Sequence, residues 1–325
     1  MLRVLVTGGA GFIGSHLVDR LLSEGYSVVV IDNLSSSVVD PCSFWGCSGT
    51  LKFIKCDLVS PSIECVSAFR DVSFVFHFAA NPEVRVSYTD PMIHFENNMV
   101  ATMNVLEASR KSMVEGIVFA SSSTVYGVAE RIPTPEDHPL EPISVYGAMK
   151  ASGEITIKTY SRLYKLKSLI LRYANIVGPR LRHGVIWDFI NKLTNNPSVL
   201  EILGDGLQRK SYLYIDDAVE ATLRAYNLLL SDEPGSIRVY NIGNTDWVYV
   251  KDIARIVADV MGLSSVEFKY ITAIPGGVGW PGDVKYMLLD ISRIVNDTGW
   301  RPRYNSYECI EKTAKAIYKG ATQSS

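Results

Sequence analysis

The sequence has almost no net charge, few cysteines and no long apolar run, and each shortage excludes a class of protein. The formal net charge is −2 over 325 residues, so the chain lacks the cationic excess that attracts proteins to nucleic acids or anionic membranes. No apolar run approaches the length of a membrane-spanning helix, and no cleavable apolar leader precedes the first predicted strand. We therefore expect a cytoplasmic protein without nucleic-acid or membrane partners.

The five cysteines give no metal-binding pattern. Four of them, Cys42, Cys47, Cys56 and Cys65, lie close together, but four residues separate Cys42 from Cys47 and no histidines accompany them, which is a poor zinc signature. Reduced structural thiols are favoured over a disulfide in this loop-rich stretch, unless the source is a hyperthermophile. The sequence predicts no metal site.

Internal repeats, low-complexity tracts and flexible linkers are also absent. With 47% hydrophobic and 20% charged residues, the chain is long enough for one sizeable core and a smaller second lobe. This composition is typical of a globular protein rather than a disordered one.

The first thing that the sequence does contain is a strand that runs through a glycine cluster into a helix. Residues 4–6 form an apolar strand of the kind buried on both faces, and apolar residues recur at helical spacing from Phe12. Gly8 permits the sharp bend, Gly11 lets the backbone approach a ligand, and Gly14 lets helix and strand pack closely. A pyrophosphate can then sit at the positive end of the helix dipole.

An acidic residue follows this turn at the distance that a dinucleotide site requires. A second apolar strand, residues 27–31, comes after the helix and ends at Asp32. A carboxylate there accepts both ribose hydroxyls of adenosine and repels a 2′-phosphate. The combination predicts a site for NAD rather than NADP, and a tight turn that binds nothing is the alternative.

A tyrosine, a lysine and a run of hydroxyl residues carry the candidate chemistry. Tyr146 and Lys150 are four residues apart in a helix predicted to reach about Tyr164, so they share one helix face. An adjacent ammonium and a positively charged nicotinamide favour the phenolate, which lets Tyr146 take a proton from an alcohol. Residues 121–124 end a predicted strand, where their hydroxyls can serve a substrate or bond their own turn.

Together these motifs resemble the extended short-chain dehydrogenase/reductase family. The motifs that carry the resemblance to its nucleotide-sugar branch, and most closely to UDP-glucose 4-epimerases, are the Gly8/Gly11/Gly14 turn, Asp32, the Ser-Ser-Ser-Thr-Val-Tyr-Gly run from Ser121, Tyr146-x3-Lys150 and the Leu-Arg-Tyr-Ala-Asn-Ile-Val-Gly-Pro run from Leu171. The resemblance covers nearly the whole chain. It implies an α/β fold, a doubly wound parallel (Rossmann) sheet with helices on both faces, and a second, smaller mixed α/β domain.

The same resemblance implies how the chain is divided and assembled. Residues 1–173 and about 212–244 are expected to form the NAD-binding domain, and about 174–211 with 245–325 the nucleotide-sugar-binding domain. The ligand cleft is expected between them. Because the family pairs its subunits through the long helices, here near 91–112 and 145–164, it implies a homodimer.

The resemblance also implies which residues bind NAD. Asp57 would face the adenine amino group, with a helix N-cap or turn carboxylate as the alternative, and Asn98 matches an asparagine near the cofactor. Residues 78–80 would lie beside the nicotinamide, whereas His77, inside the strand, is predicted to be a core histidine. The predicted cofactor-binding set is Gly8, Gly11, Phe12, Ile13, Asp32, Asn33, Asp57, Leu58, Phe78, Ala79, Ala80, Asn98, Tyr146, Lys150 and Tyr173.

Substrate-binding residues are carried over in the same way. Ser122 matches the catalytic serine or threonine of the family with Ser123 as the nearby alternative, and Asn175 matches the asparagine that touches the phosphates of the sugar nucleotide. The predicted catalytic set is Tyr146, Lys150 and Ser122, and the predicted substrate-binding set is Ser122, Ser123, Tyr146, Asn175, Arg182, Lys210 and Asp283.

The chain departs from the family where the diphosphate is bound. Lys210 and Ser211 stand at the usual Arg-Asp positions with Arg209 one place early, and Trp280 begins a Trp-Pro-Gly-Asp run that is normally Arg-Pro-Gly-Asp. A lysine supplies a point charge but no bidentate fork. The residues that can compensate are Arg180, Arg182 and Lys285.

The reaction that the resemblance implies is epimerisation at carbon 4 of a UDP-hexose such as UDP-galactose or UDP-glucose. As a hypothesis, Tyr146 deprotonates the carbon-4 hydroxyl while hydride passes to NAD, Lys150 lowers the tyrosine pKa and binds nicotinamide ribose hydroxyls, and Ser122 hydrogen-bonds the reacting oxygen. The 4-keto sugar rotates and takes the hydride back on its other face.

Three alternatives are weighed against this hypothesis. The first is another enzyme of the nucleotide-sugar branch, such as a uronate epimerase, a decarboxylase or a 4,6-dehydratase; dehydratases place Asp-Glu where this chain has Ser123-Thr124. The second is a reductase with an exchangeable cofactor. The third is an NAD-binding sensor or scaffold, which would have no need for the intact set of Tyr146, Lys150 and Ser122.

Overall fold

The computed structural model describes residues 2–47 and 49–323, and its largest element is a seven-stranded sheet. Every pairing within this sheet is parallel, in the order β11-β6-β5-β4-β1-β2-β3. Its strands are β1 (Arg3–Thr7), β2 (Ser27–Asp32), β3 (Leu51–Lys55), β4 (Phe74–His77), β5 (Gly116–Ser122), β6 (Lys167–Tyr173) and β11 (Ile237–Ile242). The strand order reverses between β1 and β4, which confirms the predicted doubly wound fold and locates its ligand crevice.

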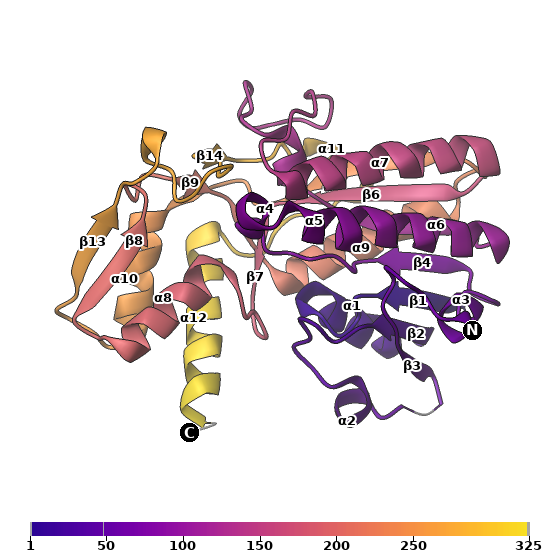
Figure 1. Ribbon diagram of the computed structural model, residues 1–325, viewed down its shortest axis with the longest axis horizontal. Coiled ribbons are helices and arrows are strands. Elements are labelled where there is room, and N and C mark those ends of the chain that lie inside the picture. The colour runs from indigo at the N-terminus through magenta and orange to yellow at the C-terminus, as the bar shows by residue number, and fades with distance from the viewer. Residues whose placement is uncertain (1, 48, 324–325) are drawn as a thin grey trace.

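The central strands are apolar throughout because their alternate residues enter two different cores. In β1, Val4 and Val6 pack with residues of α1 (Phe12–Ser23) and α9 (Ile215–Leu230), whereas Leu5 packs with residues of α6 (Ala101–Lys111) and α7 (Val145–Tyr164). The two helix pairs therefore cover opposite faces of the sheet (Figure 1). This double burial is the physical reason for the continuous apolar runs in the sequence.

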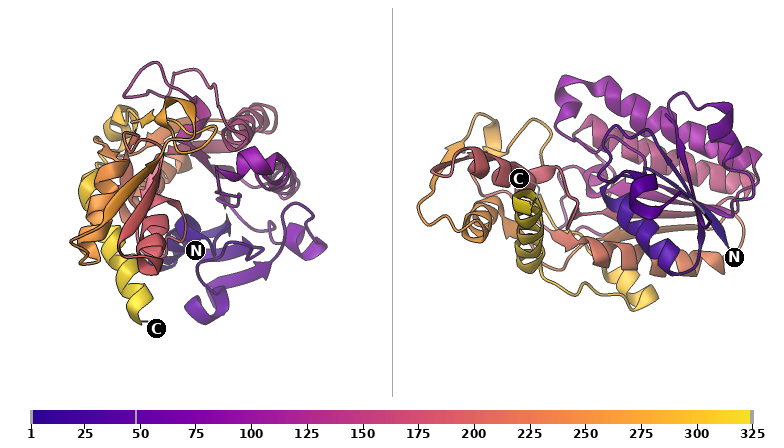
Figure 2. Two further views of the ribbon diagram at one scale, coloured as in Figure 1. Left: turned by 60° about the vertical axis from the view of Figure 1, so that its left-hand side comes forward. Right: turned by 90° about the horizontal axis from the view of Figure 1, so that it is seen from below.

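A smaller mixed α/β lobe stands at one end of the large sheet, as Figure 1 and the right-hand view of Figure 2 show. Its two small sheets have the orders β13-β8 and β12-β9-β14. Its elements are α8 (Gly184–Asn195), β8 (Val199–Leu203), β9 (Arg209–Lys210), β12 (Val248–Tyr249), α10 (Val250–Val260), β13 (Glu267–Ile271), η3 (Pro275–Gly277), β14 (Tyr286–Met287) and α12 (Ser306–Gln323). The exact domain boundaries given above stay a prediction.

The other elements are short. They are α2 (Pro41–Trp45), α3 (Ile63–Ser67), α4 (Val86–Thr89), α5 (Pro91–His94), the π-helix η1 (Phe95–Val100), η2 (Ser123–Tyr126), α11 (Ser292–Thr298) and the parallel pair β7 (Asn175–Val177) and β10 (Tyr212–Tyr214). The single helix expected over 91–112 is thus interrupted by a π-helical turn, a feature common at functional sites. It places Asn98 inside the protein, only 1% exposed.

The expectation of reduced thiols was wrong for four of the cysteines. Cys42 is bonded to Cys47 and Cys56 to Cys65, and Cys309 is a free, buried thiol. The Cα atoms of the two pairs are 4.7 and 6.1 Å apart, which is within disulfide reach, a proximity that sequence spacing alone does not reveal. The second disulfide encloses Asp57 and Leu58, two of the predicted cofactor-binding residues.

The described part of the chain was searched for membrane-spanning helices and for metal-binding groups. No helix there is both long and apolar enough to cross a bilayer. Across the same residues, no group of three or more His, Cys, Asp or Glu side chains is arranged to hold a metal ion.

Candidate active site

The turn between β1 and α1 has the close packing that its glycines predict. Gly8 has a φ of +69°, and a Cβ there would lie 2.6 Å from the Ala79 nitrogen; a Cβ on Gly14 would lie 2.1 Å from the Gly8 oxygen. Gly11 begins α1 without a side-chain cap, so the N–H groups of the first turn, where Phe12 and Ile13 lie, are available to an anion. The turn therefore fits a pyrophosphate.

The Asp32 carboxylate is held at the edge of this turn. Oδ2 accepts from the Ala10 N–H at 3.0 Å and Oδ1 from the Leu34 N–H at 2.8 Å. Burial raises the pKa of Asp32, and these two bonds partly offset that effect. Two lone pairs are left on the oriented carboxylate for ribose hydroxyls, and the neighbouring Asn33 side chain accepts from the Ser35 N–H at 3.0 Å.

Asp57 and His77 take the local roles that the sequence allowed. Asp57 is exposed and accepts from the Val59 N–H two residues on, at 2.9 Å, while Leu58 is buried. Its adenine contact stays a prediction. His77 is fully buried between Thr7 and Thr102 at 2.7 and 2.9 Å, and burial lowers its pKa to about 3. The prediction of a core histidine is confirmed.

The buried Asn98 fixes the loop that leaves β4. Its Oδ1 accepts from the Asn81 N–H at 2.7 Å, and its Nδ2 lies 3.3 Å from Nδ1 of His94. The His94 ring in turn meets the Tyr146 ring edge-on, with centroids 5.6 Å apart. Phe78, Ala79 and Ala80, which precede this loop, are partly exposed at the end of β4. Asn98 thus holds the backbone of this loop in place, and its position near the cofactor stays a prediction.

Tyr146, Lys150 and Ser122 meet at the carboxyl end of β5. Ser144 caps α7 by accepting from the Gly147 N–H at 3.1 Å, and the Ser87 hydroxyl accepts from the Tyr146 N–H at 3.1 Å. The Tyr146 hydroxyl is hydrogen-bonded to Ser122. The Lys150 ammonium lies 5.9 Å from the Tyr146 ring centroid and donates to the Ala120 carbonyl at 2.7 Å.

The next hydroxyl residues differ in orientation. The Ser122 hydroxyl accepts from the N–H and the hydroxyl of Thr124 at 3.2 and 3.0 Å, and Ser123 begins the short helix η2 beside it. The Ser121 hydroxyl instead points into the core and donates to Glu154 at 2.6 Å. Ser121 therefore does not face the site, and the substrate contacts of Ser122 and Ser123 stay predictions.

Burial governs the charges of this group in the protein alone. It raises the pKa of Tyr146 to about 12, partly offset by the bond to Ser122, and it lowers the pKa of Lys150 to about 7. Desolvation thus outweighs the effect of Ser122 on Tyr146, and the expectation that Lys150 lowers the pKa of Tyr146 stays a prediction.

Replacing Lys150 by methionine should raise the free energy of unfolding at pH 7 by about 1–4 kcal/mol, the range for removing buried charge. The pKa of Lys150 is about 7 when folded and 10.5 when unperturbed, so between these values the unfolded chain binds more protons and the unsubstituted protein gains stability as pH rises. The advantage of methionine should therefore shrink from pH 7 to pH 10. Denaturant unfolding at both pH values tests this, and an unchanged difference would contradict it.

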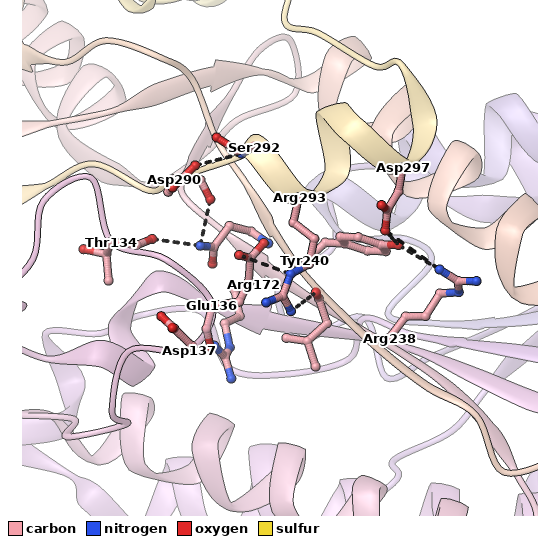
Figure 3. Close-up of polar contacts among 12 residues, drawn as sticks. Thr134, Glu136, Asp137, Arg172, Arg238, Tyr240, Asp290, Ser292, Arg293 and Asp297 are labelled. Atoms are coloured by element: carbon pink, nitrogen blue, oxygen red, sulfur yellow. Dashed lines mark hydrogen bonds and ion pairs between the residues drawn. The ribbon is translucent and has the colours of Figure 1, made fainter.

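A buried ion pair below the serines was missed from the sequence. Arg172 of β6 donates from Nε and Nη2 to the two Glu154 oxygens at 2.9 and 2.7 Å, and from Nη1 to the Tyr126 hydroxyl at 2.8 Å. Arg172 Nη1 also donates to the Glu136 carbonyl at 2.9 Å, and Figure 3 shows these two residues next to each other. A charged residue inside an apolar strand, Arg172 in 169–173, was the available signal.

The predicted substrate-binding cations have separate partners. Lys210 forms an ion pair with Asp283, Lys285 donates to Asp205 at 2.7 Å, and Arg180 donates to Asp19 at 2.7 Å. Arg182 is exposed on the loop after β7. Lys285 and Arg180 are thus engaged elsewhere, which leaves Lys210 with Asp283 as the predicted pair that the structure brings together.

The two residues predicted from the run at Leu171 face inward. The Asn175 Nδ2 donates to the Ser211 carbonyl at 3.0 Å. The Tyr173 hydroxyl lies 2.6 Å from the Thr222 hydroxyl in the core, and its ring lies beside Phe78 with centroids 6.1 Å apart. Tyr173 can thus contact a cofactor through its ring rather than its hydroxyl.

Residues 4–243 match the model of the NAD dependent epimerase/dehydratase family. The chain belongs to this family. A putative UDP-glucose 4-epimerase of Methanocaldococcus jannaschii is 35% identical over 314 residues, 95% of this chain and 96% of that protein.

Two solved structures are similar to the chain over nearly its whole length. A crystal structure of a UDP-galactose 4-epimerase is 50% identical with a TM-score of 0.87, over 98% of this chain and 99% of that one. The UDP-glucuronic acid 4-epimerase of Bacillus cereus, in complex with UDP-glucuronic acid and NAD, is 28% identical with a TM-score of 0.85, over the same shares. NAD is the cofactor of the protein, and the glycine turn, the uncapped α1 and Asp32 fit it.

Proposed function

We propose that the protein interconverts UDP-galactose and UDP-glucose by NAD-dependent epimerisation at carbon 4. The observation that carries this proposal is the grouping of Tyr146, Ser122 and Lys150 at the carboxyl end of β5, the same edge of the parallel sheet at which the dinucleotide turn follows β1. The similarity to UDP-glucose and UDP-galactose 4-epimerases supports the choice of substrate.

The residues at the site divide the work of moving one proton. Bound NAD supplies an acceptor and donor for hydride. The Tyr146 hydroxyl takes the proton from the carbon-4 hydroxyl and later returns it, and Ser122 hydrogen-bonds that oxygen and orients it. Lys150, held by the Ala120 carbonyl, supplies positive charge beside the phenol. Asn175 and Lys210 are proposed to bind the sugar nucleotide.

The experiment that tests this proposal is an NMR time course of the purified protein with UDP-galactose and no added cofactor. Conversion to UDP-glucose, with NAD released by acid, supports a self-contained epimerase. UDP-glucuronate and the N-acetylated UDP-hexoses are run in parallel to find the preferred sugar. In a separate assay with added NADH, steady NADH consumption would instead indicate a reductase. NAD binding without conversion of any sugar would indicate a sensor or scaffold.

We also propose a homodimer formed through α5, η1 and α7. Large apolar side chains are exposed on these elements. Met92 lies on α5 and Phe95 on η1. On α7, Ile155 and Leu163 are 61% and 66% exposed and lie eight residues apart on one face of the helix. Light scattering should give twice the mass of one chain. Replacing both Ile155 and Leu163 by glutamate should give a single chain, whereas glutamate at the exposed Ile63 of α3 should leave the dimer intact.

The cytoplasmic location stays a prediction. The two disulfides bear on it, because such bonds are rare in reducing compartments outside hyperthermophiles.

A further inference from the structure

Most cations near the predicted diphosphate site are turned away from it or neutralised. The Arg209 guanidinium lies 3.5 Å from the Trp247 ring centroid and donates to the Tyr249 hydroxyl at 3.1 Å. Successive residues of a strand point to opposite faces, so Arg209 and its neighbour Lys210 diverge. Lys210, and not Arg209, therefore faces the turn that carries Trp280.

Two cationic side chains lie over the Trp280 ring, and one of them belongs to the large-sheet lobe. The Lys210 ammonium lies 5.2 Å from the Trp280 ring centroid, and the Arg85 guanidinium carbon lies 5.8 Å from it. Arg85 belongs to the loop after β4, whereas Trp280 lies between β13 and β14. The contact between Arg85 and Trp280 thus joins the large-sheet lobe to the smaller lobe.

The two cations differ in how well they are neutralised. Lys210 is paired with Asp283, whose side chain is only 3% exposed. The carboxylate paired with Arg85 is that of Glu83, which is 3.8 Å away and has a side chain that is 36% exposed. A long, exposed ion pair of this kind is weak. Arg85 can therefore exchange this partner for a ligand anion, and its planar fork can bind phosphate oxygens while the cation–π contact with the indole is kept.

The turn that carries Trp280 is fixed against the helix of Tyr146. Asp283 accepts from the Gly279 N–H at 3.2 Å and donates its own N–H to the Trp280 carbonyl at 3.1 Å. Gly282 has a φ of +89°, and a Cβ there would lie 2.9 Å from the Ile143 oxygen, just before α7. Trp280 is thereby held as a firm surface for the Arg85 side chain.

We propose that Arg85, which lies over the Trp280 ring, binds the diphosphate of the sugar nucleotide in place of the arginine that related enzymes carry at position 280. This inference rests on the proposed function in that the ligand is a nucleoside diphosphate sugar. Trp280 is a positioning residue, and Lys210 adds the second positive charge.

The test is a calorimetric titration of the NAD-loaded protein with UDP and with uridine. Arg85→Met should weaken UDP binding about 10- to 100-fold, as expected for hydrogen bonds to a charged group, and leave uridine binding unchanged. Arg255→Met is the matched control, because Arg255 is an exposed arginine of α10 that is paired with Asp252 of its own helix. Adding Trp280→Arg to the Arg85→Met variant should restore most of the lost UDP affinity.

Several results would overturn the inference. Equal UDP affinity of the Arg85→Met and unsubstituted proteins does so, and this is also the result expected if Arg85 bound the carboxylate of a uronic sugar. An equal loss for UDP and uridine would show a general disturbance of the pocket instead. Absence of UDP binding in the unsubstituted protein overturns both this inference and the proposed function.

The two proposals can fail separately. Arg85-dependent UDP binding without turnover of UDP-galactose refutes the proposed function and leaves the inference standing. Turnover of UDP-galactose with UDP affinity independent of Arg85 does the reverse.

Discussion

Replacing Tyr146 by phenylalanine should lower turnover of UDP-galactose by about 10²- to 10⁴-fold, the contribution of a positioned acid–base group. The substitution removes the hydroxyl that bonds Ser122 and keeps the ring that packs against His94. Fold and NAD content should therefore be unchanged. Initial rates by NMR, together with the absorbance of NAD released by acid, measure the two effects separately.

Tyr164→Phe is the matched control for this prediction. Tyr164 lies on the same helix, is 49% exposed and contacts Arg110 through its ring, so loss of its hydroxyl should leave turnover intact. Near-normal activity of Tyr146→Phe would remove Tyr146 from the mechanism.

Arg172→Met should destabilise the protein by about 3–5 kcal/mol, because it leaves the Glu154 carboxylate buried without its main partner. Glu154 is 0% exposed, and its other contacts are the Ser121 hydroxyl at 2.6 Å and the Lys158 ammonium at 3.5 Å. Denaturant unfolding gives the difference in free energy.

A double variant separates the lost pairing from the lost volume. Arg172→Met combined with Glu154→Leu should recover much of the stability, because no unpaired charge is then buried. Arg110→Met, which removes a partly exposed partner of Glu107, should cost much less than Arg172→Met because an exposed ion pair contributes little. Equal losses at Arg172 and Arg110 would mean that burial of the first pair is energetically unimportant.

Local patterns were sufficient to predict the large sheet and the main groups at its edge. The glycine turn, Asp32 and the Tyr146–Lys150 pair each depend on residues within a few positions of one another, and strand–turn–helix geometry then fixes where they point. The fold and the grouping of Tyr146, Lys150 and Ser122 followed from these short-range rules and from the family resemblance.

Features that depend on distant parts of the chain were not predictable in this way. The partner of Arg172 is on α7, and the Arg85 contact with Trp280 joins segments almost 200 residues apart in sequence. The choice between Arg209 and Lys210 depended on which face of a two-residue strand each occupies. The disulfides depended on where a loop without periodicity folds, which composition does not encode.

The Glu154–Arg172 pair also limits how α7 can move. A helix that lies on a sheet can move most easily in two ways: it can slide along its axis or roll about that axis. A roll of about 10° would carry a side-chain tip roughly 6 Å from the axis through about 1 Å, and a misplacement of about 1 Å at a reacting group can cost 10²-fold in rate. The two parallel hydrogen bonds between Glu154 and Arg172 oppose that roll two turns after Tyr146. The Glu154–Arg172 pair, which is not proposed to contact the sugar, thereby helps to fix the orientation of Tyr146, which is.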